Sequence, residues 1–465
     1  MSKLIQFRPA LVTVAAGAAL AGTLTVAGTA SATSRAGDAH GAKLSGAAGP
    51  SHSGRGTGPH RPSTPFSDWP MLRADAGHSG VSPETAISTT TASSLTSQWT
   101  ATLGSQSDTS PAVARSASLG KALVYAGADN HLYAYPAGGG AAVWSYKLAT
   151  GVVETSPAVA NGVVYFGSTT GRMYAVNAST GALECSYNTG QAILASPVVV
   201  NDPDGSGPVV YDGTVPSSAN GGEYAIYGPG NTHGACTKDW EFTAFAVSPA
   251  GSWSSPAYST GATGVPELVF GSRDSDDSVY ALNANTGALV WRYRTSTADL
   301  ADVGAPPTVS APGVNGFAGG AVYVTGKDKI VYALNLTTGK LIWKHGLAVG
   351  THGDLSGSSL VGDRIYLGSD TGVYALNAST GAPVWHALSQ AVFYASPAVT
   401  GPAARQVLMI GSNEGTLYAL SLATGATLWA QQAARGGFWA SPAISQGAVY
   451  VAGLDGVLRS YAPRS

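Results

Sequence analysis

The fold is decided by the stretch Tyr280-Ala281-Leu282-Asn283-Ala284-Asn285-Thr286-Gly287, which is followed four residues later by Trp291. The phrase recurs, and its tyrosine and tryptophan are 11 residues apart in the copies that begin at Tyr133, Tyr280, Tyr332, Tyr374 and Tyr418. Two copies are altered: one has Cys185 in the tryptophan position, and another has a longer turn before Trp240. Self-similarity at this period indicates an array of like supersecondary units, such as a propeller or a solenoid.

A second phrase, Ser-Pro followed by Ala or Val, precedes each copy. Its serine is found at Ser110, Ser156, Ser196, Ser255, Ser396 and Ser441. Two units depart from this phrase, because one begins with Pro306-Pro307 and the other with Gly357-Ser358.

One unit shows why the repeat predicts a β-blade. Residues 156–160, 163–167, 172–177 and 182–187 are short segments, and the second is rich in the β-branched and aromatic side chains that favour strands. Asn161-Gly162 predicts a tight hairpin, because both residues accept a positive φ. Four antiparallel strands every 41 to 55 residues form one blade of a β-propeller.

The tryptophan positions count the blades. They give eight units, at Trp99, Trp144, Cys185, Trp240, Trp291, Trp343, Trp385 and Trp429. The last unit has only three strands before the chain ends, so we expect residues 95–103, which include Trp99, to supply the fourth. Closure of the ring removes an exposed sheet edge. The sequence therefore predicts an all-β fold, an eight-bladed propeller of four-stranded antiparallel blades closed by an N-terminal strand.

The repeat resembles the tryptophan-docking motif of eight-bladed propellers of the pyrroloquinoline quinone (PQQ) type. That family usually has Asp in place of Asn283, and the resemblance covers about residues 66–462. Trp69-Pro70, Arg73 and His78-Ser79-Gly80 are similar to the family's N-terminal lead-in. The resemblance implies that each repeat tryptophan packs between neighbouring blades and bonds the turn beside it. This inter-blade role falls to Trp99, Trp144, Trp240, Trp291, Trp343, Trp385 and Trp429.

Four regions are expected along the chain. Residues 1–32 resemble a signal peptide, with Lys3 and Arg8 before an apolar stretch and Ala30-Ser31-Ala32 as the cleavage site. An uncleaved anchor is the alternative, but the stretch is marginal for spanning a bilayer. Residues 33–65 read as a flexible Ser/Gly/Pro-rich linker, 66–94 as a lead-in segment, and 95–465 as the propeller. We expect a secreted, monomeric protein that does not insert in a membrane after cleavage.

Charge argues against a nucleic-acid partner. Only 11% of residues are charged, the net charge is −2, and no basic run stands out. A nucleic-acid-binding surface needs a basic patch or stripe. We therefore expect a protein or carbohydrate partner.

The sequence does not predict a catalytic site. The resemblance to PQQ dehydrogenases would imply a carboxylate and amide cluster that holds calcium against the quinone, an Asp base and two adjacent cysteines, but Cys185 and Cys236 are 51 positions apart. The Asp-rich loop at 201–207 suits a plain turn better than a calcium loop. We interpret the chain as a non-catalytic, extracytoplasmic binding or scaffolding module without a cofactor. The alternative is a PQQ-dependent alcohol or sugar dehydrogenase that uses PQQ with calcium.

The two cysteines are expected to pair. Both lie where their unit departs from the repeat, and in an oxidising compartment two such cysteines form a disulfide most often. A metal site that includes His233 is the alternative.

A candidate ligand recess is expected at one face of the ring. The residue two positions before the Ser-Pro serine should lie near the rim of the central channel, and the polar or aromatic residues at this position are Asp108, Glu154, Trp253, Tyr394 and Trp439. Phe393 and Phe438 add to the aromatic side. Aromatic walls beside an acidic edge suit a sugar, an aromatic group or a cationic segment. The alternative is that the aromatic side chains fill the pore and the acids are solvated.

Overall fold

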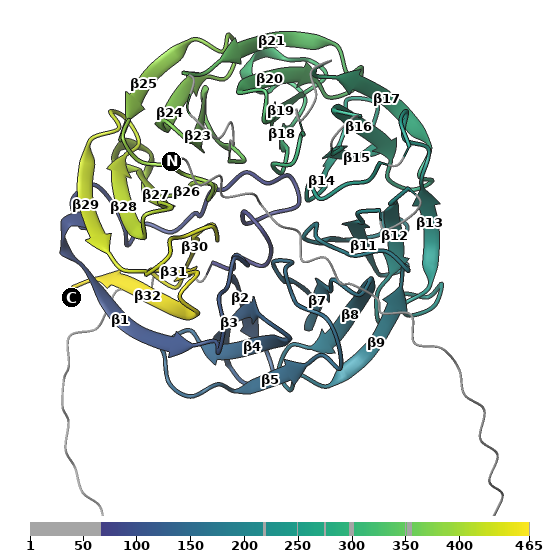
Figure 1. Cartoon of the computed structure of the whole chain (residues 1–465), viewed down its shortest axis with the longest axis horizontal. Coiled ribbons are helices and arrows are strands. Elements are labelled where there is room, and N and C mark those ends of the chain that lie inside the picture. Colours follow the sequence, from purple (N-terminus) through teal and green to yellow (C-terminus); the bar gives the residue numbers. More distant parts are fainter. Residues whose placement is uncertain are drawn as a thin grey trace, which may run out of the picture. The chain divides into compact units, whose positions relative to one another are not determined.

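The computed structural model describes residues 67–464, except 217–219, 249, 274–275, 297–301, 349 and 351–355. The expected signal peptide and linker lie outside the described residues. Eight four-stranded antiparallel sheets in the described part form a ring of blades (Figure 1), which confirms the predicted fold class. No helix among the described residues is long and apolar enough to cross a membrane.

The first four blades follow the chain, each from its inner to its outer strand. Blade 1 has β2 (Ala112–Ser116), β3 (Lys121–Ala128), β4 (His131–Pro136) and β5 (Trp144–Lys147). Blade 2 has β6 (Ala158–Ala160), β7 (Val163–Gly167), β8 (Arg172–Asn177) and β9 (Leu183–Asn188). Blade 3 has β10 (Val198–Asn201), β11 (Pro208–Gly213), β12 (Glu223–Tyr227) and β13 (Lys238–Phe242). Blade 4 has β14 (Ala257–Thr260), β15 (Pro266–Gly271), β16 (Ser278–Asn283) and β17 (Leu289–Arg294).

The next three blades repeat this order. Blade 5 has β18 (Thr308–Ser310), the 3₁₀ turn η2 (Val314–Gly316), β19 (Ala321–Thr325), β20 (Ile330–Asn335) and β21 (Leu341–Gly346). Blade 6 has β22 (Ser359–Val361), β23 (Arg364–Ser369), β24 (Gly372–Asn377) and β25 (Pro383–Ala387). Blade 7 has β26 (Ala398–Thr400), η3 (Ala403–Arg405), β27 (Val407–Gly411), β28 (Thr416–Ser421) and β29 (Thr427–Gln432).

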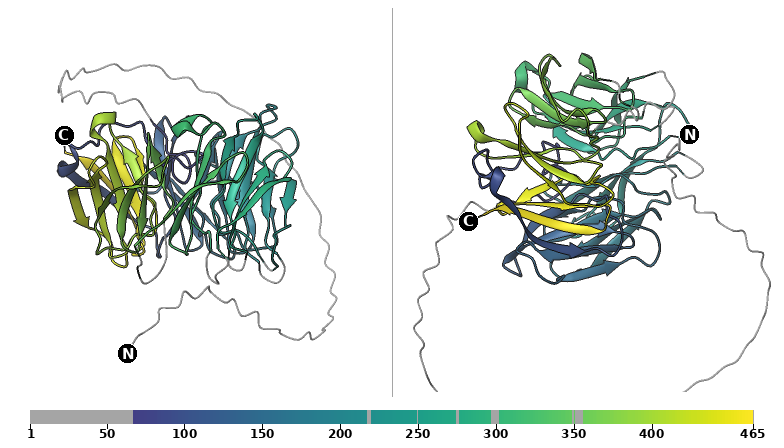
Figure 2. Two further views of the ribbon diagram at one scale, coloured as in Figure 1. Left: turned by 90° about the horizontal axis from the view of Figure 1, so that it is seen from above. Right: turned by 60° about the vertical axis from the view of Figure 1, so that its left-hand side comes forward.

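Blade 8 closes the ring with both ends of the propeller sequence. Its strands are β30 (Ala443–Ser445), β31 (Ala448–Ala452), β32 (Val457–Pro463) and, as the outermost strand, β1 (Leu95–Thr102), which follows η1 (Ala92–Ser94). Strand β1 pairs antiparallel with β32 from Leu95↔Pro463 to Thr102↔Val457. In Figure 2 the purple and yellow strands lie side by side. The predicted closure by an N-terminal strand is confirmed.

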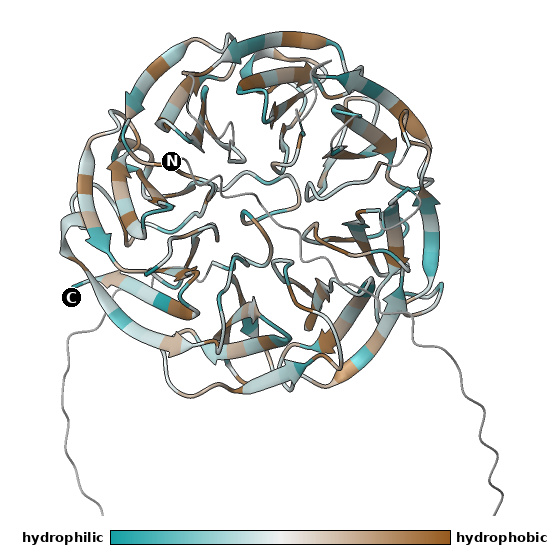
Figure 3. Ribbon diagram, in the orientation of Figure 1, coloured by the Kyte–Doolittle hydropathy of each residue, from teal (hydrophilic) through white to brown (hydrophobic). Residues whose placement is uncertain are grey.

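The core lies between the blades. Strand β7 is buried along its whole length, and so are β15, β19, β27 and β31, because each of these strands is covered by a neighbouring blade on both faces. Their sequences are accordingly mostly apolar, although β15 carries the buried Glu267. The outer strands meet solvent on one side, and β13 is largely hydrophilic (Figure 3).

The lead-in segment, residues 67–84, crosses the inside of the ring. Its backbone bonds the inner strand of one blade after another, accepting from Val159, Tyr258, Val309 and Leu360, and exchanging bonds with Val113 and Val399. Figure 1 shows this purple segment winding among the inner strands. Its two ends meet, because Ser67 Oγ donates to Glu84 Oε1 over 2.7 Å and Gly447 N donates to Glu84 Oε2 over 2.7 Å. The lead-in therefore forms a closed loop inside the ring and satisfies the edges of six inner strands.

Candidate functional site

The Ser-Pro phrase builds an arc of hydrogen bonds close to the inner strands of the ring. In five consecutive steps the backbone N–H of one serine donates to the Oγ of the serine in the next blade, over 2.8–2.9 Å. The arc runs through Ser396, Ser441, Ser110, Ser156, Ser196 and Ser255. The recurrence of this serine is therefore explained by a side chain that joins six consecutive blades, from blade 7 through blade 8 to blade 4, near their inner strands.

The arc is broken where the sequence departs from the phrase, and the lead-in fills the break. Pro306 and Gly357 have no hydroxyl, and Arg73 lies there: its Nη1 donates to Thr308 Oγ1 over 3.1 Å and to the Pro306 carbonyl over 3.5 Å. A Cβ on Gly357 would come 2.9 Å from Arg73 Nη1. Burial lowers the pKa of Arg73 to about 9, so this guanidinium is charged at neutral pH.

His78 lies beside Arg73. Its Nδ1 is 3.1 Å from the Pro307 carbonyl oxygen, which can only accept, so Nδ1 carries the proton. Burial, with Arg73 adding to it, lowers the pKa of His78 to about 3. The imidazole is therefore neutral at any ordinary pH, and we assign both side chains a structural role at the break in the serine arc.

Four of the five recess candidates lie at consecutive positions of the arc. Tyr394, Trp439, Asp108 and Glu154 each stand two residues before a serine of blades 7, 8, 1 and 2. We call these four residues the rim arc. The rings of Tyr394 and Trp439 meet edge to face with centroids 5.9 Å apart, and Trp439 is 36% exposed.

The two acids of the rim arc influence each other. Burial raises the pKa of Asp108. Burial and then the neighbouring Asp108 carboxylate raise the pKa of Glu154. Neither acid pairs with a lysine, arginine or histidine in the part of the chain that the structure describes. The rim arc is thus an aromatic pair followed by a carboxylate pair.

The fifth candidate, Trp253, lies on blade 4, outside the rim arc. Its indole packs on Gly304, where an added Cβ would come 2.4 Å from Trp253 Nε1. Lys327 Nζ is 4.8 Å from its ring centroid and 3.0 Å from Asp302 Oδ2, and the Arg273 guanidinium carbon is 5.9 Å from the ring centroid. The structure therefore does not join Trp253 to the other four candidates.

The expectation that Phe393 and Phe438 add to the aromatic side of the recess is wrong. Both side chains are fully buried, and they fill the spaces that Gly368 and Gly411 leave on the second strands of blades 6 and 7. They belong to the hydrophobic core, Phe393 in a cluster shared by blades 6 and 7 and Phe438 in a cluster shared by blades 7, 8 and 1.

The repeat tryptophans lie between blades. Six of them donate from Nε1 to a backbone carbonyl of the next blade over 2.6–3.1 Å: Trp99 to Ala137, Trp144 to Ala178, Trp240 to Ala284, Trp291 to Leu336, Trp343 to Ala378 and Trp385 to Leu422. In blade 8 the strand beside β32 is β1, which comes from the other end of the propeller sequence, so the turn that receives the tryptophan in the other blades does not join these two strands. Trp429 instead meets Tyr461 edge to face, with centroids 5.5 Å apart.

A set of tyrosines shares this role and was not recognised from the sequence. Each of these tyrosines lies on the second strand of its blade and donates to the carbonyl that also accepts from the tryptophan of that blade. They are Tyr125, Tyr211, Tyr323 and Tyr450. Each of these tyrosines follows a valine, as in Val124-Tyr125 and Val449-Tyr450, and this repeated pair could have identified them from the sequence.

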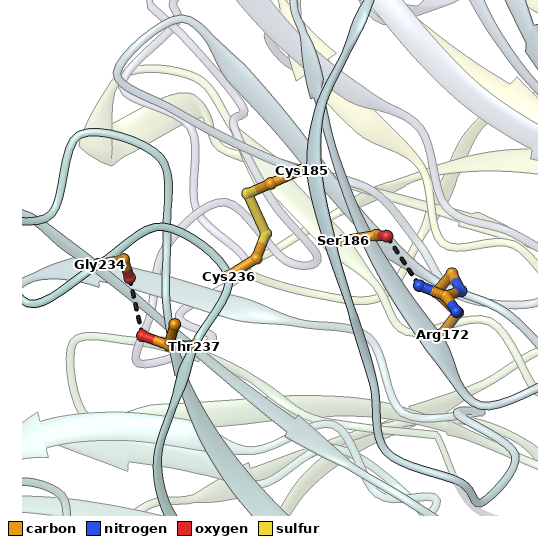
Figure 4. Close-up of a disulfide and its surroundings, with 6 residues drawn as sticks. All are labelled: Arg172, Cys185, Ser186, Gly234, Cys236 and Thr237. Carbon is orange, nitrogen blue, oxygen red and sulfur yellow. Dashed lines mark hydrogen bonds between the residues drawn. A yellow bond between two sulfur atoms is a disulfide. The ribbon is translucent and has the colours of Figure 1, made fainter.

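The disulfide joins Cys185 on β9 to Cys236 in the turn before β13, with Cα atoms 5.9 Å apart (Figure 4). Cys185 occupies the tryptophan position of blade 2, and Cys236 lies in the turn of blade 3 that would receive that tryptophan. The covalent bond thus stands in place of the tryptophan contact. No group of three or more His, Cys, Asp or Glu side chains in the described residues could hold a metal ion.

This architecture defines the class of the protein: an eight-bladed propeller with tryptophan-docked blades of the PQQ-like type. The family described as "Outer membrane protein assembly factor BamB" matches residues 81–233 and 369–465, more than half of the chain, and the chain belongs to this family of PQQ-like repeat proteins. The family described as "Glucose/ethanol/alcohol dehydrogenase, beta-propeller domain" matches residues 258–346. No curated protein sequence matches the chain significantly.

Solved structures of dehydrogenases and of BamB share the fold. A europium-containing methanol dehydrogenase superposes with a TM-score of 0.69 at 15% identity, covering 85% of this chain and 98% of that one. The quinohemoprotein alcohol dehydrogenase from Comamonas testosteroni gives 0.67 at 16% identity, covering 86% and 82%. BamB from Moraxella catarrhalis gives 0.57 at 18% identity, covering 79% and 97%. At these identities the likeness establishes the fold alone.

Proposed function

We propose that this chain is a secreted, non-catalytic propeller that binds or scaffolds a protein or carbohydrate partner, with the rim arc as its binding site. The observation that carries the proposal is the rim arc itself. Its aromatic pair, Tyr394 and Trp439, and its two acids, Asp108 and Glu154, hold the same register in four consecutive blades, and Trp439 is 36% exposed. Exposed aromatic side chains with a few polar groups are typical of recognition sites.

The arrangement favours this proposal over a PQQ-dependent dehydrogenase. Calcium takes six to eight oxygen ligands, whereas the rim arc presents two carboxylates, Asp108 and Glu154, and no group of three or more His, Cys, Asp or Glu among the described residues could hold a metal ion. The two cysteines are held in a disulfide between blades 2 and 3. The residues present therefore do not fit a calcium-bound quinone, and we derive no step through one.

A capture experiment tests the proposal. Immobilised parent protein and its Trp439→Ala variant are exposed to culture supernatant and cell-wall fractions, and bound material is compared by mass spectrometry. We expect a defined partner that the parent retains and the variant loses. Identical capture by the two proteins would place the binding site elsewhere.

The dehydrogenase alternative has its own test. The protein is reconstituted with PQQ and Ca²⁺, and the dye-linked oxidation of alcohols and aldoses is measured. We expect no turnover above that of PQQ and Ca²⁺ without protein. Protein-dependent turnover would overturn the non-catalytic proposal.

A further inference from the structure

Arg73 is a fully buried arginine of the lead-in, only 1% exposed. Its Nη1 donates to Thr308 Oγ1 over 3.1 Å and to the Pro306 carbonyl over 3.5 Å. Within the described part of the chain, its Nε and Nη2 have no hydrogen-bond partner. The structural role at the break in the serine arc therefore accounts for one of the three guanidinium nitrogens and leaves two unexplained.

The two unpartnered nitrogens form one edge of the guanidinium plane. Nη1 lies on the side of Cδ and Nη2 on the side of the Nε hydrogen, so the Nε–H and Nη2–H groups are parallel. This edge is the fork through which arginine binds a carboxylate with two hydrogen bonds. Nη1, whose partners belong to blade 5, lies outside the fork. The unused part of Arg73 is thus a complete carboxylate-binding group.

The described protein does not supply a carboxylate to this fork. None of the ion pairs among the described residues includes Arg73. Asp75 favours the charged form of Arg73 from a distance, but its carboxylate accepts from Gly77 N, Ser79 N and Ser79 Oγ. His78 beside it is neutral, because burial and then Arg73 lower its pKa to about 3. The positive charge of Arg73 is therefore buried without a counterion of its own.

A small anion would remove this cost. Buried charges in folded proteins are paired and buried donors are hydrogen-bonded, because each loses its hydration on burial. A water molecule would satisfy the donors but not the charge, whereas a carboxylate satisfies both. The guanidinium lies against the backbone of blade 6, since a Cβ on Gly357 would come 2.9 Å from Nη1. A ligand of a fork that is buried in this way has to be small.

We propose that the fork of Arg73 binds a small carboxylate, of the size of formate or acetate, where the lead-in meets blades 5 and 6. The two oxygens of the ligand accept from Nε and Nη2. Because Arg73 is 1% exposed, the ligand is enclosed when the lead-in docks and leaves when the lead-in opens. This internal counterion is separate from the rim arc and goes beyond the proposed function.

The first experiment asks what the purified protein contains. The full secreted protein is purified and dialysed in chloride buffers without carboxylates, then unfolded in guanidinium chloride, and the released carboxylates are measured by ion chromatography and mass spectrometry. We expect the parent to release one carboxylate for each chain. Arg73→Lys keeps the charge but loses the planar fork, so it should release at least tenfold less. Arg435→Lys is the matched control, because Arg435 is exposed in the loop between β29 and β30, and it should release as much as the parent.

The second experiment measures stability with the ligand in excess. A ligand that binds the folded state and not the unfolded state raises the melting temperature as its concentration rises. The probes are sodium formate and sodium acetate, each compared with sodium chloride at the same ionic strength. We expect the parent and Arg435→Lys to melt at a higher temperature in formate or acetate than in chloride. Arg73→Lys should melt at the same temperature in all three salts.

A released carboxylate or a carboxylate-dependent rise in melting temperature supports the proposal if Arg73→Lys abolishes it. Equal results for Arg73→Lys and the parent would overturn the proposal, and so would the absence of both effects in the parent. A higher melting temperature in chloride than in either carboxylate would overturn it in favour of a chloride ion. If Arg73→Lys does not fold, Gly357→Ala replaces it, because the added Cβ displaces the guanidinium. None of these results bears on the capture experiment, which tests the proposed function by itself.

Discussion

The indole of Trp343 lies directly on Gly381, across the boundary between blades 5 and 6. Gly381 has a φ of +70°, and a Cβ added there would come 2.5 Å from Cε3 of the indole. The same relationship joins Trp99 to Gly139, Trp144 to Gly181, Trp240 to Gly287, Trp291 to Gly339 and Trp385 to Gly425. The Thr-Gly turn and the tryptophan of the repeat are therefore two halves of one inter-blade contact.

Gly381→Ala should destabilise the protein more than Gly362→Ala. Both glycines have a positive φ, which costs an L-residue about 1–2 kcal/mol, but an added Cβ at Gly362 meets nothing within 4 Å. At Gly381 the Cβ must displace Trp343, and overpacking of this kind costs typically about 1–3 kcal/mol more. Chemical denaturation of both variants measures the difference. Equal free energies of unfolding for the two variants would mean that the indole of Trp343 moves aside without loss of stability.

Closure by β1 predicts a sharp difference between two truncations. A chain that begins at Leu95 keeps β1 and loses the lead-in, whereas a chain that begins at Leu103 loses both. Without β1 the backbone of β32 is an unpaired edge, which invites aggregation. We expect the shorter chain to aggregate or to melt well below the longer one, as measured by light scattering and calorimetry. Similar behaviour of the two chains would show that β1 contributes little to closure.

The double variant Cys185→Ser, Cys236→Ser tests the disulfide. A loop closed over a separation of 51 residues is worth about 4 kcal/mol in the chain-entropy model. We expect a lower free energy of unfolding in the variant, and the parent should show the same loss under reductant. Alkylation of the secreted parent, followed by mass spectrometry, should label neither cysteine before reduction. Two labelled thiols would contradict the bond.

Glu267 makes stability depend on pH. Burial raises its pKa to about 7 in the folded protein, against about 4.3 in an unfolded chain. The folded state binds more protons than the unfolded state between these values, so the contribution of Glu267 to stability falls as pH rises from about 4.3 to 7. Glu267→Gln should remove that part of the slope and be more stable than the parent at pH 8.

Melting temperatures from pH 4 to pH 8 check this prediction. Glu184→Gln is the control, since Glu184 lies exposed on β9. Parallel pH profiles for the parent and Glu267→Gln would show that another group sets the dependence.

The sequence predicts the blades well because their information is local and repeated. Tyr280, Gly287 and Trp291 recur at fixed spacing, so the strands assigned in one unit can be assigned in the other units as well. The spacing of Trp99 from the other tryptophans is enough to identify the closing strand. The lead-in is different. It has no repeat, and its bonds reach residues as distant as Val309 and Val399. No local pattern encodes such contacts.

The candidate site was predictable in part for the same reason. The register of the Ser-Pro phrase predicts that Asp108 and Trp439 hold equivalent positions in neighbouring blades, and the hydrogen bond from Ser441 N to Ser110 Oγ agrees with this. It could not show that Lys327 covers Trp253, because Lys327 comes from a turn outside the phrase. Pro306 and Gly357 were visible departures, yet only the structure shows Arg73 filling the break that they leave.

Trp439 should carry much of the binding energy of the rim arc. Trp439 is 36% exposed and meets Tyr394 edge to face, and we expect a ligand of this face to contact the indole. We expect any ligand of this face to quench tryptophan fluorescence, and Trp439→Ala to bind it at least tenfold more weakly. Trp253→Ala is the matched comparison, because it removes the same residue at the same register, and its effect should be smaller since Lys327 already covers that ring. Unchanged affinity in Trp439→Ala, or an equal loss in both variants, would move the site from the rim arc, most plainly to the loops at the blade edges.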